Sequence, residues 1–204
     1  MTTDKELLII FTKVPQLGKA KTRLAASVGD EKALEVYQGL LSHTHAVTFA
    51  LSQEKIVYYT PYIVADDQWE SSIFQKALQS AGDLGERMQQ AFAQGFARGY
   101  ARICIIGTDC FDLTTEHLTE AFTALHEHDV VLGSSQDGGY YLLGMNQLYA
   151  SLFSNKTWST ESVADRTRQD IQKQQLSLKE LPILNDIDTI DDLKRSSLGA
   201  KYLK

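Results

Sequence analysis

Cysteine is scarce in this chain, and long apolar runs are missing from it. Only two cysteines occur among the 204 residues, so no disulfide framework is expected, and we predict a protein of the reducing cytoplasm. No apolar run approaches the roughly 20 residues that a membrane helix needs. The polar residues 1–6 do not resemble a secretory signal. We therefore expect neither a membrane span nor export.

A surplus of positive charge is missing as well. The net charge of −6 argues against general affinity for nucleic acid or for anionic membranes. A phosphate-bearing ligand must then be held by a local group of basic side chains or by a metal ion. The sequence has no repeats and no low-complexity linker, and its 43% of hydrophobic residues is ordinary for a globular protein. At this length we expect a single domain over residues 1–204.

Short apolar runs alternate with helical patterns along the chain. The patterns predict strands over 7–11, 55–60, 102–106, 129–133, 138–144 and 176–181, and helices over 31–50, around 69, over 84–100, 114–126, 147–153 and 160–174, and after 189. We take Asp30 as the N-cap of the first helix. The alternation predicts a three-layer α/β fold with a doubly wound, mainly parallel sheet. A strand near 139–144 follows its predecessor too closely for a crossover helix and is expected to run antiparallel.

An aspartate follows one of the most apolar of these strands. The segment 102–109 ends in Gly-Thr-Asp, so the strand delivers the Asp109 carboxylate to its own C-terminal end. Ligands of open α/β sheets bind in the crevice at that edge, and a carboxylate there suits a hard divalent cation that carries phosphates. The alternative is that Asp109 only turns the chain or caps the next helix. The neighbouring Cys110 has no evident histidine partner, and the five histidines lack zinc-site spacing.

The loop after the first strand is unusually basic for an acidic protein. A glycine, Gly18, and backbone amides in such a loop can approach an anion closely, while lysine and arginine attract phosphate. The loop is not a P-loop, because the first glycine of that motif and the hydroxyl residue after its lysine are both absent. The alternative is a solvated basic loop without a ligand. The basic residues are Lys13, Lys19, Lys21 and Arg23.

Two acidic segments stand next to predicted elements, one at the start of a helix and one after the last strand. The segment 82–88 enters a helix, and it is either a helix start with favourable charge or a wall of a nucleotide pocket near Gly85. After the last strand come Asp186 and Asp188. Mg²⁺ often takes one or two carboxylates together with water and substrate phosphates, so one of these can share a cation with the earlier aspartate. Asp188 or Thr189 can equally cap the last helix, and both roles are compatible.

A carboxylate, two glycines and two aromatics stand together at 137–141. Glycine permits a positive φ and lets the backbone approach a ligand. Asp137 is placed to bind a sugar hydroxyl or to act as a general base. The alternative is an Asp-Gly hairpin turn, one of the strongest short-range hairpin signals.

Taken in order, these motifs resemble a bacterial family of small proteins in the GT-A glycosyltransferase superfamily. Members are described as nucleotide-diphospho-sugar transferases or glycosyltransferases, and some are linked to arsenosugar biosynthesis. Phe111 stands where the family pattern has proline, and 133–135 reads Gly-Ser-Ser in place of Gly-Pro-Ala, but neither change removes a charged group. The segments that carry the resemblance are 11–24, 82–88, 107–110, 137–144, 158–160 and 186–193, which together span nearly the whole chain.

The resemblance implies a GT-A fold and a role for each of these segments. Asp109 and Asp188 would be the ligands of Mg²⁺ or Mn²⁺. The acceptor side would include Gly138, Gly139 and Tyr140, with Asp137 as the catalytic base. Lys21 and Arg23 would also act in catalysis, by neutralising charge on the leaving diphosphate. The nucleotide and its phosphates would lie against Lys13, Gly18, Lys21, Arg23, Gly85 and Asp109.

Three functions follow from this set of residues. The leading hypothesis is a metal-dependent glycosyltransferase with a nucleotide-diphospho-sugar donor and a small-molecule acceptor. The main alternative is a nucleotidyltransferase of the same fold, which joins a nucleoside triphosphate to a phosphorylated compound and releases pyrophosphate. A third is a nucleotide-binding regulator without turnover. One fold hosts many chemistries, so the choice depends on the site. The base, sugar, acceptor and oligomeric state stay open.

Overall fold

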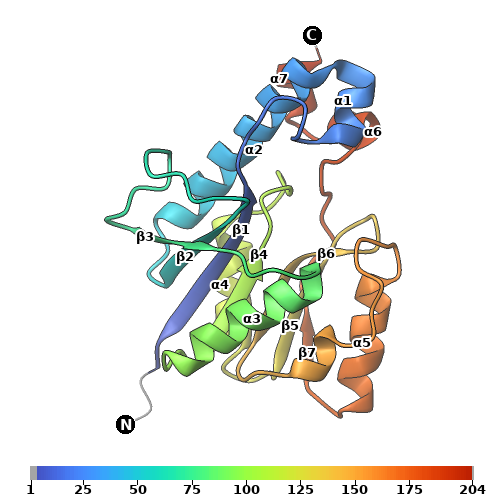
Figure 1. Ribbon diagram of the computed structural model, residues 1–204. Helices are drawn as coiled ribbons and strands as arrows, with labels where there is room; N and C mark the ends of the chain where they lie inside the picture. The colour runs from blue at the N-terminus through green and yellow to red at the C-terminus, as the bar shows by residue number, and fades with distance from the viewer. Residues whose placement is uncertain (1–3, 204) are drawn as a thin grey trace.

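One sheet of seven strands runs through the computed structural model, which describes residues 4–203 (Figure 1). The strand order is β3-β2-β1-β4-β6-β5-β7. β6 pairs antiparallel with β4 and β5, whereas the other pairs in the described sheet are parallel. The predicted sheet and its antiparallel strand are confirmed. The strands are β1 (Glu6–Lys13), β2 (Glu54–Thr60), β3 (Phe74–Leu78), β4 (Arg102–Ile106), β5 (Val130–Ser134), β6 (Tyr140–Met145) and β7 (Leu178–Glu180).

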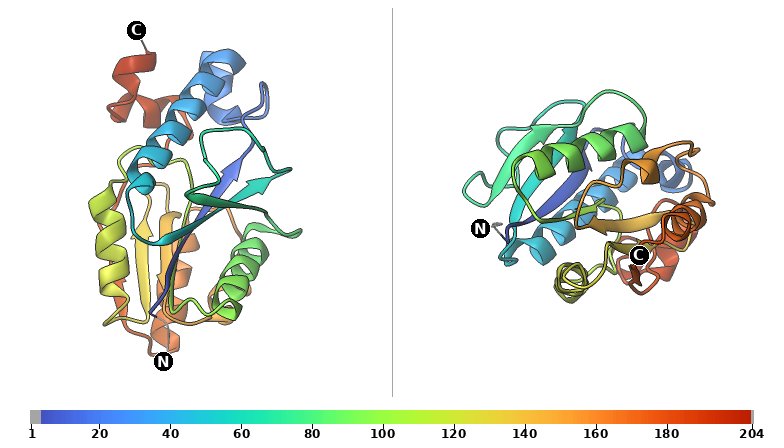
Figure 2. Two further views of the ribbon diagram at one scale, coloured as in Figure 1. Left: turned by 90° about the vertical axis from the view of Figure 1, so that its left-hand side faces the viewer. Right: turned by 90° about the horizontal axis from the view of Figure 1, so that it is seen from below.

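Helices cover both faces of the sheet, so the fold has three layers with the sheet in the middle (Figure 2). One face carries α4 and the C-terminal part of α2, and the other carries α3, η1 and α5. Among residues 4–203, no helix combines the length and the apolar character that crossing a bilayer requires. The helices are α1 (Thr22–Val28), α2 (Asp30–Phe49), α3 (Leu84–Ala97), α4 (Thr115–Ala124), the 3₁₀ helix η1 (Ala150–Phe153), α5 (Val163–Lys173), α6 (Ile190–Arg195) and α7 (Gly199–Tyr202).

The central strands are apolar along their whole length because both of their faces are buried. On β1, Leu8 and Ile10 share a core with Phe122 of α4, whereas Leu7 and Ile9 belong to the core under α3. Successive side chains of a strand point to opposite faces, so this uninterrupted run supplies two cores at once. The continuous apolar pattern is therefore what a central parallel strand requires.

A third apolar cluster lies above the carboxyl edge of the sheet. It joins α1, the N-terminal part of α2, α6 and α7, which are grouped at the top of Figure 1. Leu24 of α1, Leu40 of α2, and Ile187 and Leu193 near α6 are fully buried there. This cluster brings the first loop of the chain next to its last helices, directly over the edge where ligands of such sheets bind.

Three local expectations were wrong. No helix forms around Trp69; the chain turns there and enters β3, whose first residue Phe74 packs edge-on against the Trp69 ring at 5.0 Å. β3 is a five-residue edge strand without a regular alternation of apolar and polar residues, and its ladder with β2 defines it. Helix α1 occupies part of the expected loop. Gly29, with φ 82°, precedes α2 as its N-cap, and Asp30 is the first helical residue rather than the cap.

Gly95 of α3 packs closely against the side chains of β1 and β4, which leads to a prediction about stability. In the interior of a helix, alanine is normally more stabilising than glycine by about 1 kcal/mol. Here a Cβ would lie 2.5 Å from Cδ1 of Ile103 and 3.0 Å from Cδ2 of Leu7. We expect Gly95→Ala to lower the free energy of unfolding by about 1–3 kcal/mol through overpacking, as measured by urea denaturation.

Ile103→Val supplies the matching control, because it removes the Cδ1 atom that the new methyl group would meet. The double variant Gly95→Ala/Ile103→Val should lose less stability than the sum of the two single losses, since the residues are in contact. Simple additivity of the two losses would show that the close approach is not the cause.

Candidate functional site

A cavity of about 1130 Å³ opens at the carboxyl edge of the sheet. Its walls come from the loop after β1, the loop after β4, the hairpin between β5 and β6, the segment before α5 and the segment before α6. Most residues that the sequence assigned to a site converge here. Those that line the cavity are Lys13, Lys21, Arg23, Asp109, Asp137, Gly139, Tyr140 and Asp188.

Backbone pairing brings the last acidic segment to the end of β4. Cys110 and Asp186 form an isolated antiparallel bridge, and the Ile187 amide donates to the carbonyl of Asp109 at 2.9 Å. These contacts are far apart in sequence, yet they place the two aspartates on either side of Ile187 beside the Asp109 loop. The two acidic motifs are therefore one structural unit.

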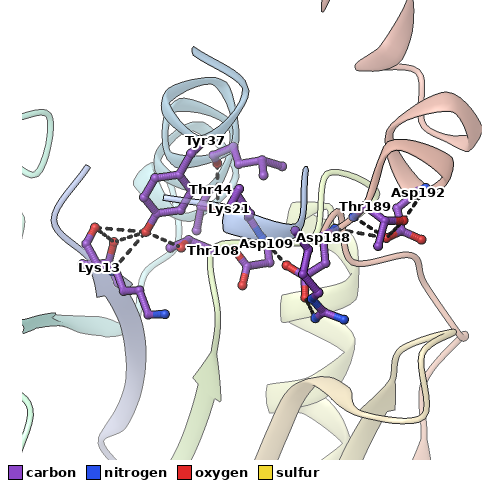
Figure 3. A network of polar contacts seen from close by, with 12 residues as sticks. Lys13, Lys21, Tyr37, Thr44, Thr108, Asp109, Asp188, Thr189 and Asp192 are labelled. Carbon is purple, nitrogen blue, oxygen red and sulfur yellow. Dashed lines mark hydrogen bonds and ion pairs between the residues drawn. The ribbon is translucent and has the colours of Figure 1, made fainter. Parts of the chain in front are cut away.

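The cap of α6 fixes Asp188 without using its carboxylate. Thr189 is the N-cap, and it forms a capping box with Asp192. The Asp192 carboxylate also accepts from the Asp188 amide at 3.2 Å, as Figure 3 shows beside the labelled Asp188. The side chain of Asp188 is thereby left to face the cavity. The helix cap and the site residue are adjacent, so the two roles considered for this segment are compatible.

Lys21 joins the two aspartates (Figure 3). Its Nζ lies 2.6 Å from Oδ1 of Asp109 and 2.8 Å from Oδ1 of Asp188, and only 5% of its side chain is exposed. The backbone of Lys21 is left-handed, with φ 49°, at the N-cap of α1. Non-glycine residues rarely adopt this conformation, and where it occurs the surroundings enforce it, often at functional sites.

The charges of the site are strongly coupled. Burial of Lys21 favours its neutral form, but the carboxylates of Asp109 and Asp188 outweigh burial and raise its pKa above the usual lysine value. Burial of Asp188 works against its ionisation, yet Lys21 and Arg23 together hold its pKa below the usual range. Arg23 reaches Oδ2 of Asp188 at 2.5 Å from an exposed position. Lys21 and Asp188 thus stay ionised despite their burial, because oppositely charged side chains lie beside them.

Asp186 has the opposite character. Burial raises the pKa of this carboxyl to about 8, and the negative charge of Asp109 adds to the effect. The side chain lines the same cavity. At neutral pH Asp186 is therefore mostly protonated, and it adds a hydroxyl donor to the site rather than another negative charge.

Tyr37 of α2 ties the ends of β1 and β4 together, a role that no sequence pattern predicted. Its hydroxyl donates to the Lys13 carbonyl and accepts from the Lys13 amide, both at 3.0 Å. It also lies 3.4 Å from Thr12 Oγ1 and 3.5 Å from Thr108 Oγ1. Burial raises the pKa of this phenol, with the charge of Asp109 as a further cause. A single tyrosine on a helix carries no signal of such a contact.

Asp137 lies in the hairpin between β5 and β6. Its Oδ1 accepts from Ser135 Oγ at 2.5 Å and from the Gly139 amide at 3.0 Å. The Asp-Gly turn is therefore present, and its carboxylate still lines the cavity. Because β6 runs antiparallel, this hairpin lies at the same edge as the ends of the parallel strands. Tyr140 begins β6 and donates to Met88 Sδ at 3.6 Å, closing the wall toward α3.

Three of the predicted glycines lie outside the cavity lining. Gly18 lies beside Asp30, since a Cβ there would be 3.5 Å from its Oδ2. A Cβ on Gly85 would be 2.3 Å from the Trp158 ring, and one on Gly138 would be 2.0 Å from the Glu161 carbonyl. Because they lack a side chain, Gly85 and Gly138 leave room for the segment 158–163, which forms part of the cavity wall. Their roles toward a ligand stay predictions.

Arg87, Trp158 and Glu161 line the cavity, although no role was assigned to them from sequence. Arg87 Nε donates to the Gly82 carbonyl at 2.8 Å, which holds its guanidinium at the start of α3. Arg87 stands inside the 82–88 motif and Trp158 begins the 158–160 motif, so the signal was present in both cases. What the sequence could not show is that these segments face one another.

Cys110 has the properties of a buried thiol. Burial raises its pKa, so the thiolate required for nucleophilic catalysis is disfavoured. Among residues 4–203, no group of three or more histidine, cysteine or acidic side chains is arranged as a complete metal site. Asp109 and Asp188 would therefore supply two ligands at most, with water and phosphate completing the shell.

A family model matches residues 43–160, and its family is described as uncharacterized proteins conserved in bacteria, DUF2064. The chain is also similar to the crystal structure of a proposed nucleotide-diphospho-sugar transferase from Desulfovibrio desulfuricans G20. The identity is 30% and the TM-score 0.85, over 92% of this chain and 84% of that one. The comparison with curated proteins found no match.

More distant solved structures share the fold. The inositol-1-phosphate CTP transferase from T. maritima is 14% identical with a TM-score of 0.57, over 100% of this chain and 96% of that one. Rv0371c from Mycobacterium tuberculosis H37Rv, solved in complex with manganese, is 11% identical with a TM-score of 0.55, over 94% and 97% of the two chains. At these identities the likeness describes the fold alone.

The raised pKa of Asp186 predicts how stability depends on pH. The folded chain keeps this proton up to about pH 8, whereas the unfolded chain releases it near about pH 4. The folded state thus binds more protons in that window, and the contribution of Asp186 to stability falls as pH rises. Asparagine does not titrate. We expect Asp186→Asn to gain stability over the wild type between pH 5 and pH 8, by on the order of 1 kcal/mol or more.

Thermal melting in EDTA measures this effect, at about 2–4 °C for each kcal/mol in a chain of this size. Asp66→Asn makes the same chemical change at an exposed loop position and should show no such trend. A Tm difference between Asp186→Asn and wild type that stays constant from pH 5 to pH 8 would contradict the assignment.

The Tyr37 hydroxyl generates a second stability prediction. Tyr37→Phe removes both bonds to Lys13 from a buried position, so we expect a loss of about 1–2 kcal/mol in the free energy of unfolding. Tyr62→Phe is the matched control, because that hydroxyl bonds Gln16 on the exposed surface and its loss should stay within about 0.5 kcal/mol. The free energy of unfolding is measured by urea denaturation. Equal losses in the two variants would contradict the stabilising role assigned to the Tyr37 hydroxyl.

Proposed function

This chain belongs to DUF2064, a family described as uncharacterized proteins conserved in bacteria, and we propose that it is a metal-dependent glycosyltransferase that uses a nucleotide-diphospho-sugar donor. One observation carries the proposal: Asp109 and Asp188, from two distant segments, hold a single positive charge between them inside the cavity. The D. desulfuricans protein, a proposed nucleotide-diphospho-sugar transferase, supports the same class of reaction.

The residues at this point fit a divalent cation. The Lys21 ammonium is a cation already bound by Oδ1 of both aspartates, so it stands in for a metal ion in position and charge sign. Carboxylate oxygens are the ligands that Mg²⁺ and Mn²⁺ prefer. When bound by Asp109 and Asp188, the metal would neutralise charge that develops on the leaving diphosphate. The manganese complex of Rv0371c, a protein of the same fold, lends support.

The basic side chains of the cavity suit the diphosphate. Lys13 lies at the end of β1, Arg23 in α1 and Arg87 in α3, and all three line the cavity. Arginine offers a planar pair of donors to phosphate and lysine a mobile point charge. Because the whole chain is acidic, these groups make the cavity the natural place for a polyanionic ligand.

Asp137 is the proposed base for the acceptor. In the reaction, an acceptor oxygen forms a bond to the anomeric carbon of the sugar while the bond from that carbon to the diphosphate oxygen breaks. Asp137 receives the proton of the acceptor hydroxyl, and the nucleoside diphosphate leaves with the bonding electrons. The Gly139 amide and the Ser135 hydroxyl both donate to Oδ1 of Asp137, which fixes the carboxylate and leaves Oδ2 for the acceptor.

Nucleotidyl transfer is the second candidate. The fold shared with the inositol-1-phosphate CTP transferase from T. maritima favours it. In that reaction the α-phosphate of a nucleoside triphosphate would be attacked by a phosphorylated acceptor, with pyrophosphate as the leaving group. The two chemistries place similar charges against Asp109, Asp188 and the basic side chains, so the released product distinguishes them.

Product release tests the proposal directly. With Mn²⁺, an acceptor mixture and a panel of nucleotide sugars, we expect release of nucleoside diphosphate, and Asp137→Asn should lower kcat by about 10²–10⁴-fold through loss of the base. Asp66→Asn, an exposed aspartate outside the cavity lining, should keep wild-type activity. The four nucleoside triphosphates are assayed in parallel for release of pyrophosphate.

Each result has a distinct meaning. Pyrophosphate release without nucleoside diphosphate release replaces glycosyl transfer by nucleotidyl transfer. Nucleotide binding that raises the Tm, survives Asp109→Ala, needs no metal and gives no turnover identifies a regulator instead. The absence of both binding and turnover over the whole panel would reject the proposed function.

A further inference from the structure

Lys21 occupies the position that the proposed metal needs. Its Nζ contacts the same Oδ1 atoms of Asp109 and Asp188 that would ligate a divalent ion. We propose that the Lys21 ammonium is the resident cation of this aspartate pair, and that a divalent metal binds only by displacing it toward the phosphates of the nucleotide. This inference rests on the proposed function and concerns how its metal site is filled.

The two cations exclude one another by geometry. Mg²⁺ binds carboxylate oxygens at about 2.0–2.1 Å. The ammonium lies 2.6 and 2.8 Å from the same two oxygens, so a metal between them would lie in contact with it. Two positive ions at so short a distance repel one another strongly, so a metal on these two Oδ1 atoms competes with Nζ for them. Binding of the metal therefore requires the lysine to leave.

The structure holds Lys21 in place before any metal arrives. The side chain is 5% exposed, and its left-handed backbone stands at the start of α1. The next turn is anchored by Leu24, which is fully buried in the cluster of α1, α2, α6 and α7. In the preceding turn, the Ala20 amide donates to the Gln16 carbonyl at 3.2 Å. The ammonium is thus preorganised toward the aspartates rather than free in solvent.

The charges around Lys21 indicate what would release its ammonium from the two aspartates. Arg23 contacts Oδ2 of Asp188 and stays available to that carboxylate, so Lys21 is the only described cation on Oδ1 of both acids. A diphosphate in the cavity offers the ammonium negatively charged oxygens that can replace the two carboxylates as its partners. Metal and nucleotide should then bind cooperatively, because each removes the obstacle to the other. Without a nucleotide, the wild-type site should bind metal weakly.

Metal affinity in the absence of nucleotide tests the exchange. We expect Lys21→Met to bind Mn²⁺ about tenfold or more tightly than the wild type, because it removes a unit charge beside a divalent ion. Lys21→Arg keeps the charge and should bind Mn²⁺ as weakly as the wild type. Electron paramagnetic resonance of free Mn²⁺ measures each affinity, and circular dichroism with the Tm checks that each variant folds. Lys21→Gln is the substitute if Lys21→Met does not fold.

Lys173→Met is the matched control, since it removes an exposed lysine that also pairs with a carboxylate, that of Asp170, and that lies outside the cavity lining. Its Mn²⁺ affinity should stay near the wild-type value. Adding a nucleoside diphosphate should then raise the Mn²⁺ affinity of the wild type more than that of Lys21→Met. A Lys21→Met affinity equal to or below that of the wild type, or no detectable Mn²⁺ binding in any variant, overturns the inference.

The two proposals fail in different ways. If Lys21→Met gains Mn²⁺ affinity but no nucleotide sugar is turned over by the wild type, the exchange stands and the glycosyltransferase assignment falls. If the wild type transfers sugar but Lys21→Met binds Mn²⁺ no more tightly, the function stands and the exchange falls.

Discussion

A buried ammonium that must be neutralised is the constraint on which this site depends. Lys21 is almost wholly enclosed, so it requires both Asp109 and Asp188, and loss of either carboxylate would leave an uncompensated buried charge. The three residues come from the first loop, the end of β4 and the segment before α6. The ion pairs therefore link the beginning, the middle and the end of the chain at one edge of the sheet.

The backbone supports what the charges require. The bridge between Cys110 and Asp186 carries the last segment past the end of β4, and the capping box at Thr189 then starts α6 with the Asp188 carboxylate left over. The cluster of α1, α2, α6 and α7 packs above these contacts and keeps the first loop close. Packing, capping and electrostatics thus act on the same few residues, which is how a site is kept in a defined geometry.

The reversed direction of β6 decides how the other half of the cavity is built. Because β6 runs against its neighbours, the tight hairpin at 135–139 lies at the carboxyl edge and presents Asp137 to the same cavity that Lys21 lines. Gly85 and Gly138 then admit Trp158 and the Glu161 backbone at distances that no side chain would allow. The wall of the cavity facing α3 is a consequence of these two missing Cβ atoms.

The sequence by itself determined the layered fold, and most of the site residues predicted from it line the cavity. Apolar runs along β1, β4 and β5 specify buried parallel strands, and parallel strands bring their following loops to one edge, so it was predictable that Lys13, Asp109 and Asp137 lie at the same edge of the sheet. Local patterns also predicted the acidic start of α3, whose cap is Asp83. These features follow from periodicity and turn chemistry, which act over a few residues.

Only the tertiary structure decided the rest. No local pattern shows that Lys21 lies on the aspartates rather than free for phosphate, that Tyr37 joins two strand ends, or that burial keeps Asp186 protonated. Edge strand β3 and helix α1 were missed for the same reason, since their stability comes from partners distant in sequence. Burial, charge pairing and close approach depend on which segments meet, and a linear pattern does not contain that information.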